Sequence, residues 1–201
     1  MDARDTPEQA ELRRTARQLA HQLGPRTVAD LDDLKRSERF AAAVRDAGWL
    51  ELRHDAGDGA PLASGVEAAI IADALGEAVA DVSFAGPVLA ADLARRAGAR
   101  AGDGAVVAFA PDLIDAAVVS GPATTTPIHA IDCPTRSPGT AYVLVPEAAG
   151  YRLACVQVDA ASDGTDLTLS VEGQPGVART MEPGDPKVVV LAEHRGQKLP
   201  S

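Results

Sequence analysis

The segment His54-Asp55-Ala56-Gly57-Asp58-Gly59 is the first place where residue types and spacing could support catalysis. It satisfies the H-x-x-x-D-G pattern, in which acyl-transfer enzymes use the histidine as a general base and the aspartate as a structural group. Those enzymes are much longer two-lobed proteins with the pattern well inside the chain. Asp and Gly are also the residues that turns favour. We therefore interpret the segment as a turn between helices and assign no catalytic residue.

The other candidate groups lack the companions that their chemistry needs. No serine occurs in the G-x-S-x-G elbow of a serine hydrolase. Gly102-Asp103-Gly104 lacks the third glycine and the following helix of a dinucleotide fingerprint. The remaining histidines and both cysteines have no spacing typical of metal ligands, so we predict no metal site and two reduced thiols; these residues are His21, His129, His194, Cys133 and Cys155. His21, near a helix end, is assigned a structural or surface role.

The arginines near residue 100 form the one basic cluster that could bind a ligand. Arg95 and Arg96, followed by Arg100, could contact a phosphate of coenzyme A. A solvated helix face is the simpler interpretation, and we prefer it. Cofactor-binding residues therefore stay unknown at this point.

A helical first half must position these groups. Thr6-Pro7-Glu8-Gln9 combines an N-cap hydroxyl, a proline and a capping-box glutamine, and Gly24-Pro25 ends the helix. Its arginines Arg13, Arg14 and Arg17 are expected to stay solvated. A second helix is predicted from about Ser37 to Gly48, which suits the left-handed position after a helix.

Two more helices complete this half. Ser64 and Glu67 repeat the capping-box spacing before a third helix, and Pro87 opens a fourth that Gly98 ends. The expected apolar face of the third helix consists of Val66, Ile70, Ile71, Ala74, Leu75 and Val79.

The hydrophobic period changes from helical to alternating after Gly102. Strands are predicted at 106–110, 116–119, 151–158, 167–171, 177–181 and 187–191. The proline-rich stretch 122–139 is predicted to be a long loop. We therefore expect an α+β fold: an all-α helical lobe over about 5–99, a small antiparallel β lobe over 103–192, and a polar tail over 193–201.

Composition excludes some functions. The formal charge of −10 and the pI near 4.8 oppose nucleic-acid binding, which depends on Lys and Arg displacing counterions. No stretch reaches the roughly 20 apolar residues of a membrane span, and Met1-Asp2-Ala3-Arg4-Asp5 is not a signal-peptide core. We expect a cytoplasmic protein that binds neither nucleic acid nor membrane.

The helical half resembles the N-terminal lobe of the flavin-dependent acyl-CoA dehydrogenases, especially their divergent actinobacterial type. The resemblance is carried by four segments: Val44-Arg45-Asp46-Ala47-Gly48-Trp49-Leu50, Asp55 to Gly59, Ala72-Asp73-Ala74-Leu75-Gly76-Glu77, and Phe84-Ala85-Gly86-Pro87-Val88-Leu89-Ala90. Asp73 replaces the family's usual glutamate, and Gly57-Asp58-Gly59 replaces its Gly-Gly. In the β half, Ile114-Asp115-Ala116-Ala117-Val118-Val119 is similar to a family strand in outline only.

The resemblance implies FAD, an acyl-CoA substrate of lipid, sterol or polyketide type, and a fold without the family's C-terminal helical lobe. In the family that lobe carries the glutamate base and part of the flavin cradle. The family's Trp-x-Thr flavin-stacking pattern is missing, because the single tryptophan, Trp49, lies in the helical half. Thr124-Thr125-Thr126 could offer hydroxyls to a flavin, but we interpret it as a loop.

We therefore expect an acyl-CoA dehydrogenase-like chain that is incomplete or noncatalytic and does not bind FAD by itself. It should form a homo-oligomer or join a homologous acyl-CoA dehydrogenase. The alternative is a non-enzymatic scaffolding subunit that binds a full-length homologue through its helical lobe.

Overall fold

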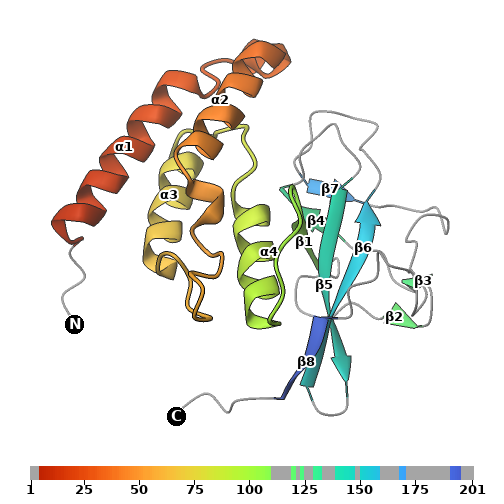
Figure 1. Cartoon of the computed structure of the whole chain (residues 1–201). Coiled ribbons are helices and arrows are strands. Elements are labelled where there is room, and N and C mark those ends of the chain that lie inside the picture. The colour runs from red at the N-terminus through yellow and green to blue at the C-terminus, as the bar shows by residue number, and fades with distance from the viewer. Residues whose placement is uncertain are drawn as a thin grey trace.

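The computed structural model describes residues 5–109, 119–120, 123–124, 129–132, 139–147, 150–158, 168–170 and 191–195. It is an α+β protein, as the sequence predicts: four α-helices precede a mixed sheet. Figure 1 shows the helices gathered on one side of the sheet, with α4 between the other helices and the strands. The acyl-CoA dehydrogenase-like form of this fold remains a proposal.

The first helix forms as its capping residues predict. In α1 (Pro7–Leu23) the Thr6 hydroxyl accepts from the Gln9 backbone N–H at 3.3 Å, and the Gln9 side chain accepts from the Thr6 N–H at 3.0 Å. A short 3-10 turn, η1 (Val28–Asp32), then leads into α2 (Leu34–Asp46). This helix begins before the predicted Ser37, because Asp33 caps it by accepting from the Arg36 N–H at 3.1 Å.

The turn after α2 is built on a left-handed glycine. Gly48 has φ of +70°, as predicted, and a 3-10 turn, η2 (Trp49–Glu51), follows it. This turn brings Trp49 into the core between the helices. The same core contains Ala16, Ala20, Phe40, Val44, Ile71, Ala74, Leu75, Val82, Phe84 and Val88.

The third helix, α3 (Gly65–Glu77), buries a narrower face than the sequence predicts. Ile70, Ile71, Ala74 and Leu75 are buried, but Val66 and Val79 are exposed. Val66 lies in the first turn, and the helix ends before Val79, which has φ of +48°. The prediction was therefore wrong at both ends of the apolar face.

The strands form a six-stranded sheet in the order β7-β4-β1-β5-β6-β8. Their bounds are β1 Val106–Phe109, β4 His129–Ile131, β5 Gly139–Glu147, β6 Gly150–Val158, β7 Thr168–Ser170 and β8 Leu191–Arg195. A separate pair joins β2 (Val119–Ser120) to β3 (Ala123–Thr124). The predicted strand at 151–158 is confirmed, as are those at 106–110 and 167–171 over their described residues. Of 116–119 only Val119 is described, and 177–181 lies outside the described residues. Of 187–191 only Leu191 is described.

The expectation of an antiparallel sheet is wrong at one pair of strands. β1 pairs with β4 in antiparallel fashion on one side and with β5 in parallel fashion on the other. The chain reverses direction at β4 and again at β5, so β5 runs in the same direction as β1 and lies beside it. The predicted loop at 122–139 contains β3, β4 and the first residue of β5, and β8 extends into the expected tail at 193–201. Hydrophobic period alone does not reveal which strands become neighbours.

The fourth helix, α4 (Ala85–Arg96), joins the two halves. Its buried Ala90 and Ala94 pack with Ala105, Tyr142 and Leu153 of the β half. The Tyr142 hydroxyl accepts from the Gly102 backbone N–H at 3.2 Å. Small side chains on α4 let the helix approach the sheet closely, so the helical half and the sheet share an interface.

Candidate functional site

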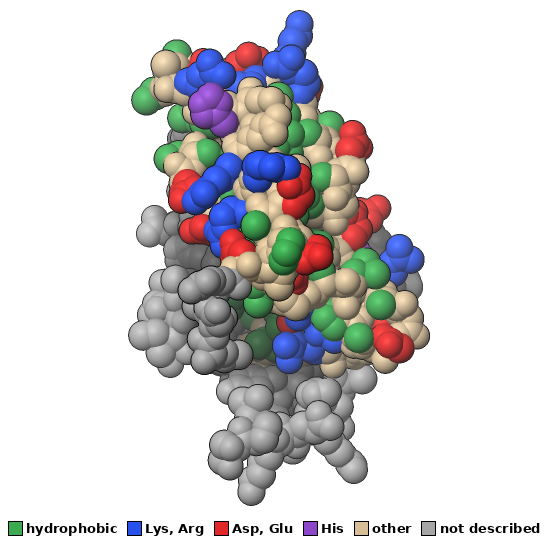
Figure 2. All heavy atoms as spheres, turned by 90° about the vertical axis from the view of Figure 1, so that its left-hand side faces the viewer, with side chains coloured by type: hydrophobic (Ala, Val, Ile, Leu, Met, Phe, Trp, Pro, Cys, Tyr) green, Lys and Arg blue, Asp and Glu red, His purple; other side chains and the backbone are tan. Residues whose placement is uncertain are grey.

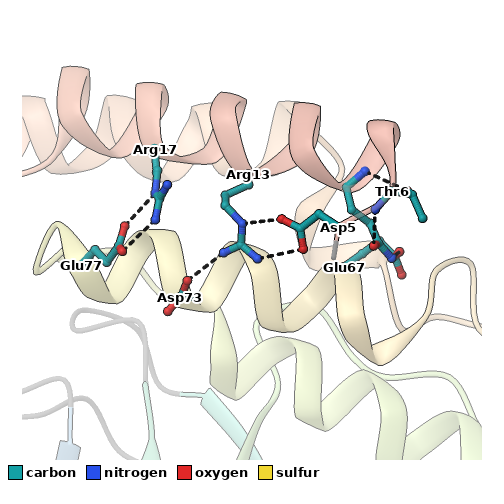
Figure 3. Close-up of polar contacts among 8 residues, drawn as sticks. Asp5, Thr6, Arg13, Arg17, Glu67, Asp73 and Glu77 are labelled. Atoms are coloured by element: carbon teal, nitrogen blue, oxygen red, sulfur yellow. Dashed lines mark hydrogen bonds and ion pairs between the residues drawn. The ribbon is translucent and has the colours of Figure 1, made fainter. Parts of the chain in front are cut away.

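A row of polar contacts holds α1 against α3 (Figure 3). Arg13 donates to Asp5 and to Asp73, each at 2.8 Å, and Arg17 donates to Glu77 at 2.7 and 2.8 Å. The Arg13 guanidinium lowers the pKa of Asp5, and Arg17 lowers that of Glu77. Arg17 stays exposed, as expected, and Arg13 is half-buried; both also bridge two helices. Exposed pairs of this kind orient helices more than they stabilise them.

The surface over α1 mixes both signs of charge. Figure 2 shows acidic and basic side chains next to one another on this face, with hydrophobic side chains in small separate groups. The face therefore offers neither a uniform charge nor a broad apolar area.

The segment that matches the acyl-transfer motif forms a turn that its own aspartate side chains stabilise. One Asp55 carboxylate oxygen accepts from the Gly57 N–H at 2.7 Å and from the Gly59 N–H at 2.8 Å, which lowers the pKa of Asp55. Asp58 accepts from the Ala60 N–H at 2.9 Å. The φ angles of Gly57 and Gly59, +111° and +83°, explain why glycine is needed. Among the described contacts His54 and Asp58 form no pair, in agreement with the turn interpretation.

Next to this turn, three arginines surround one carboxylate, a group that we call the Asp92 cluster (Asp92, Arg53, Arg95 and Arg96). Arg53 donates to Asp92 Oδ1 at 2.6 and 3.1 Å, and Arg95 Nη2 donates to the same oxygen at 2.8 Å. Arg96 Nε donates to Oδ2 at 2.7 Å. Arg53 also donates to the Ala63 carbonyl oxygen and Arg95 to that of Gly59, at 2.7 and 2.6 Å. The cluster thus fastens the segment between η2 and α3 onto α4.

The arginines of this cluster differ in how far they are exposed to solvent. The side chains of Arg53 and Arg95 are 12% and 11% exposed, whereas that of Arg96 is 62% exposed. The sequence suggested that both Arg95 and Arg96 lie on a solvated face. Arg96 does, but Arg95 does not. Burial raises the pKa of Asp92, but hydrogen bonds from Arg95, Arg96 and Arg53 outweigh it and lower that pKa to about 2. Asp92 is ionised at neutral pH.

Sequence reasoning did not single out Arg53 or Asp92. A usable signal existed on α4, because Asp92 precedes Arg95 and Arg96 by three and four residues, the spacing of side chains on one helix face. Nothing in the sequence indicated that Arg53, from a different segment, would join them.

A second buried ion pair joins α2 to the segment that follows α3. Arg36 donates to Asp81 at 2.8 Å through Nη1, with a second contact through Nη2, and its Nη1 also reaches the Leu23 carbonyl oxygen at 2.9 Å. Hydrogen bonding to Asp81 raises the pKa of Arg36 further. Both charged groups have hydrogen-bond partners within the chain, so we assign this pair a structural role.

A carboxylate from the sheet caps α4. Asp132, directly after β4, accepts from the backbone N–H of Phe84 at 2.5 Å and of Gly86 at 3.4 Å. Its own carbonyl oxygen accepts from the Ser83 hydroxyl. Burial raises the pKa of Asp132, and the hydrogen bonds from Phe84 and Gly86 oppose that change. Phe84, the N-cap residue, provides no side-chain cap, so Asp132 supplies one from another element.

Removing this cap should loosen the junction between the helices and the sheet. Asp132 has φ of +58°, a conformation that Asn and Gly tolerate and Ala resists. We expect Asp132→Gly to cost about 1 kcal/mol through the lost cap, and Asp132→Ala to cost about 1–2 kcal/mol more through backbone strain. Asp132→Asn should stay close to the original chain. Urea denaturation measures all three, and equal stability of the Gly variant and the original chain would contradict a capping role.

The described residues do not fit the flavin arrangement that the resemblance implies. Trp49 is buried among the helices and has no free face for stacking. Thr124 lies on β3, and Thr125 and Thr126 lie outside the described residues. We therefore derive no chemical step through FAD.

The remaining predicted positions do not assemble into a site. His21 is exposed in the last turn of α1. Cys155 is half-buried beside α4, and burial raises its thiol pKa. His129 and His194 lie on β4 and β8, and Cys133 is outside the described residues. Within the described part of the chain, no three His, Cys, Asp or Glu residues are grouped to hold a metal ion.

Comparisons of the chain with family models, with curated proteins and with solved structures found no match. Among the described helices, none combines the length and the apolar character needed to cross a membrane.

Proposed function

We propose that this chain is an acyl-CoA dehydrogenase-like subunit that does not oxidise acyl-CoA by itself and acts by associating with a second copy of the chain. The observation that carries the proposal is an exposed group of apolar side chains at η1 and the start of α2. Support for the family comes from the sequence segments that resemble it, which fall on α2, η2, the turn at 55–59, α3 and α4. The buried position of Trp49 supports the noncatalytic part.

The apolar group, which we call the η1 patch, consists of Val28, Leu31 and Leu34, which are 84%, 44% and 42% exposed. Side chains three residues apart lie on one side of a 3-10 turn, so Val28 and Leu31 share a face. Large apolar side chains that cluster at a surface mark an interaction site more often than single ones do. The patch lies away from the sheet, at the end of the helical half where α1 leads into α2 (Figure 1).

The charges around the patch favour a second copy as its partner. Asp32 is acidic, Arg26 and Lys35 are basic, and all three are exposed. A two-fold interface brings the same surface of each copy together, so it needs a surface that complements itself. An apolar centre with both signs of charge at its rim meets that need.

Association is tested with Leu31→Asp, which should convert a dimer to a monomer in size-exclusion chromatography with light scattering. Val66→Asp is the matched control, because Val66 is an exposed apolar residue on α3, outside the patch, and it should leave the dimer intact. A monomeric original chain, or equal dissociation by both variants, would remove the association proposal.

The noncatalytic part is tested separately with the purified original chain and added FAD. We expect no flavin absorbance to co-elute with the protein and no reduction of an electron-accepting dye with acyl-CoA substrates. A yellow protein that oxidises acyl-CoA would instead establish a complete dehydrogenase. The two tests can fail independently.

A further inference from the structure

We infer that the Asp92 cluster is a binding site for a phosphate group. This inference goes beyond the proposed function and does not depend on it. It rests on the charge balance of the cluster, on unused hydrogen-bond donors, and on the contrast between its buried and exposed arginines.

The cluster has more positive charge than its own carboxylate can balance. Asp92 carries one negative charge, and Arg53, Arg95 and Arg96 each carry a positive one that persists at any physiological pH. Asp55 supplies a further negative charge nearby, because Arg95 lowers its pKa, so the positive excess at the cluster lies between one and two charges. In a chain of net charge −10, an excess of cations at one place is a local feature that needs an explanation.

The cluster also has donors without acceptors. Arg95 Nε is shielded from solvent and has no hydrogen-bond partner among the described atoms. Buried polar groups are paired in the great majority of cases, and unpaired ones commonly indicate an ion or a water. Among the described contacts Arg96 uses only Nε, on Asp92, and its side chain remains largely exposed, so its two terminal nitrogens can face a ligand.

Phosphate suits this arrangement better than a carboxylate does. A phosphate monoester carries up to two negative charges, enough to balance the remaining positive charge, and guanidinium groups bind its oxygens in pairs. Buried Arg53 and Arg95 stay fixed by the Ala63 and Gly59 carbonyl oxygens, so they are already oriented before a ligand arrives. Exposed Arg96 provides the contact at the surface.

The test is calorimetric titration with inorganic phosphate, with coenzyme A and with dephospho-coenzyme A, all at constant ionic strength. We expect binding to the original chain, and Arg96→Gln should weaken it by about tenfold or more because a charge-assisted contact is lost. Arg96→Lys should weaken it less. The matched control is Arg14→Gln, since Arg14 is also largely exposed, at 73% against 62% for Arg96, and pairs with one carboxylate, Glu11, on the same helix; it should change affinity less than about twofold.

The ligands distinguish the sources of the phosphate. Tighter binding of coenzyme A than of its dephospho form identifies the ribose phosphate, and equal binding of both, tighter than inorganic phosphate, identifies the diphosphate. Binding of inorganic phosphate alone identifies a site for the free ion. No binding of any of the three, or an affinity that Arg96→Gln leaves unchanged, would overturn the inference. Ligand binding should also raise the melting temperature, which provides an independent measurement.

Discussion

Ile70→Asp is expected to abolish cooperative folding of the helical half. The Ile70 side chain is 3% exposed on α3, so the substitution places a carboxylate at a buried position. An unpaired buried charge costs on the order of 4 kcal/mol or more, which is a large part of the roughly 5–15 kcal/mol that stabilises a typical domain. Circular dichroism during heating should show a lost or strongly lowered melting transition.

A matched control separates burial from the chemistry of aspartate. Val66→Asp introduces the same residue on the same helix, at a side chain that is 52% exposed. It lies in the first turn of α3, where the helix dipole favours negative charge, so stability should change by less than about 0.5 kcal/mol. If both variants melted alike, Ile70 could not belong to the core.

Asp92→Ala is expected to destabilise the chain by about 3–5 kcal/mol, the range for removing one partner from a buried ion pair. The loss leaves Arg53 and Arg95 buried without a carboxylate. The segment between η2 and α3 would then lose its attachment to α4. Urea denaturation measures the change, and Glu38→Ala, at an exposed position of α2, is the control that should stay within about 0.5 kcal/mol.

The same carboxylate predicts a pH dependence with a defined sign. The folded-state pKa of Asp92 is about 2, below its ordinary value of 3.8. Its contribution is therefore fully present above about pH 5 and is lost as the pH falls toward 2. The shift corresponds to roughly 2 kcal/mol before solvent screening reduces it. The difference in stability between the original chain and Asp92→Ala should shrink between pH 5 and pH 2; a constant difference would show that packing, and not charge, is responsible.

The sequence by itself determined most of the helical half. Thr6 with Gln9, Gly48 and Ser64 act over neighbouring residues only, and their short-range geometry sets where a helix starts or ends. The turn at 55–59 was predicted for the same reason, because Asp55 binds backbone groups two and four residues away. Strands with clear alternation, such as β6, were also predicted correctly.

Tertiary structure decided the features that join distant segments. The parallel pairing of β1 with β5, the cap that Asp132 gives to α4, and the meeting of Arg53 with Asp92 all link residues more than 30 positions apart. The exposure of Val66, in the first turn of α3, and of Val79, beyond its end, depended on where the helix lies against the rest of the chain and where it stops. Hydrophobic period and capping residues report local preference, whereas the partner of a buried charge or of a strand edge is chosen by the packing of the whole chain.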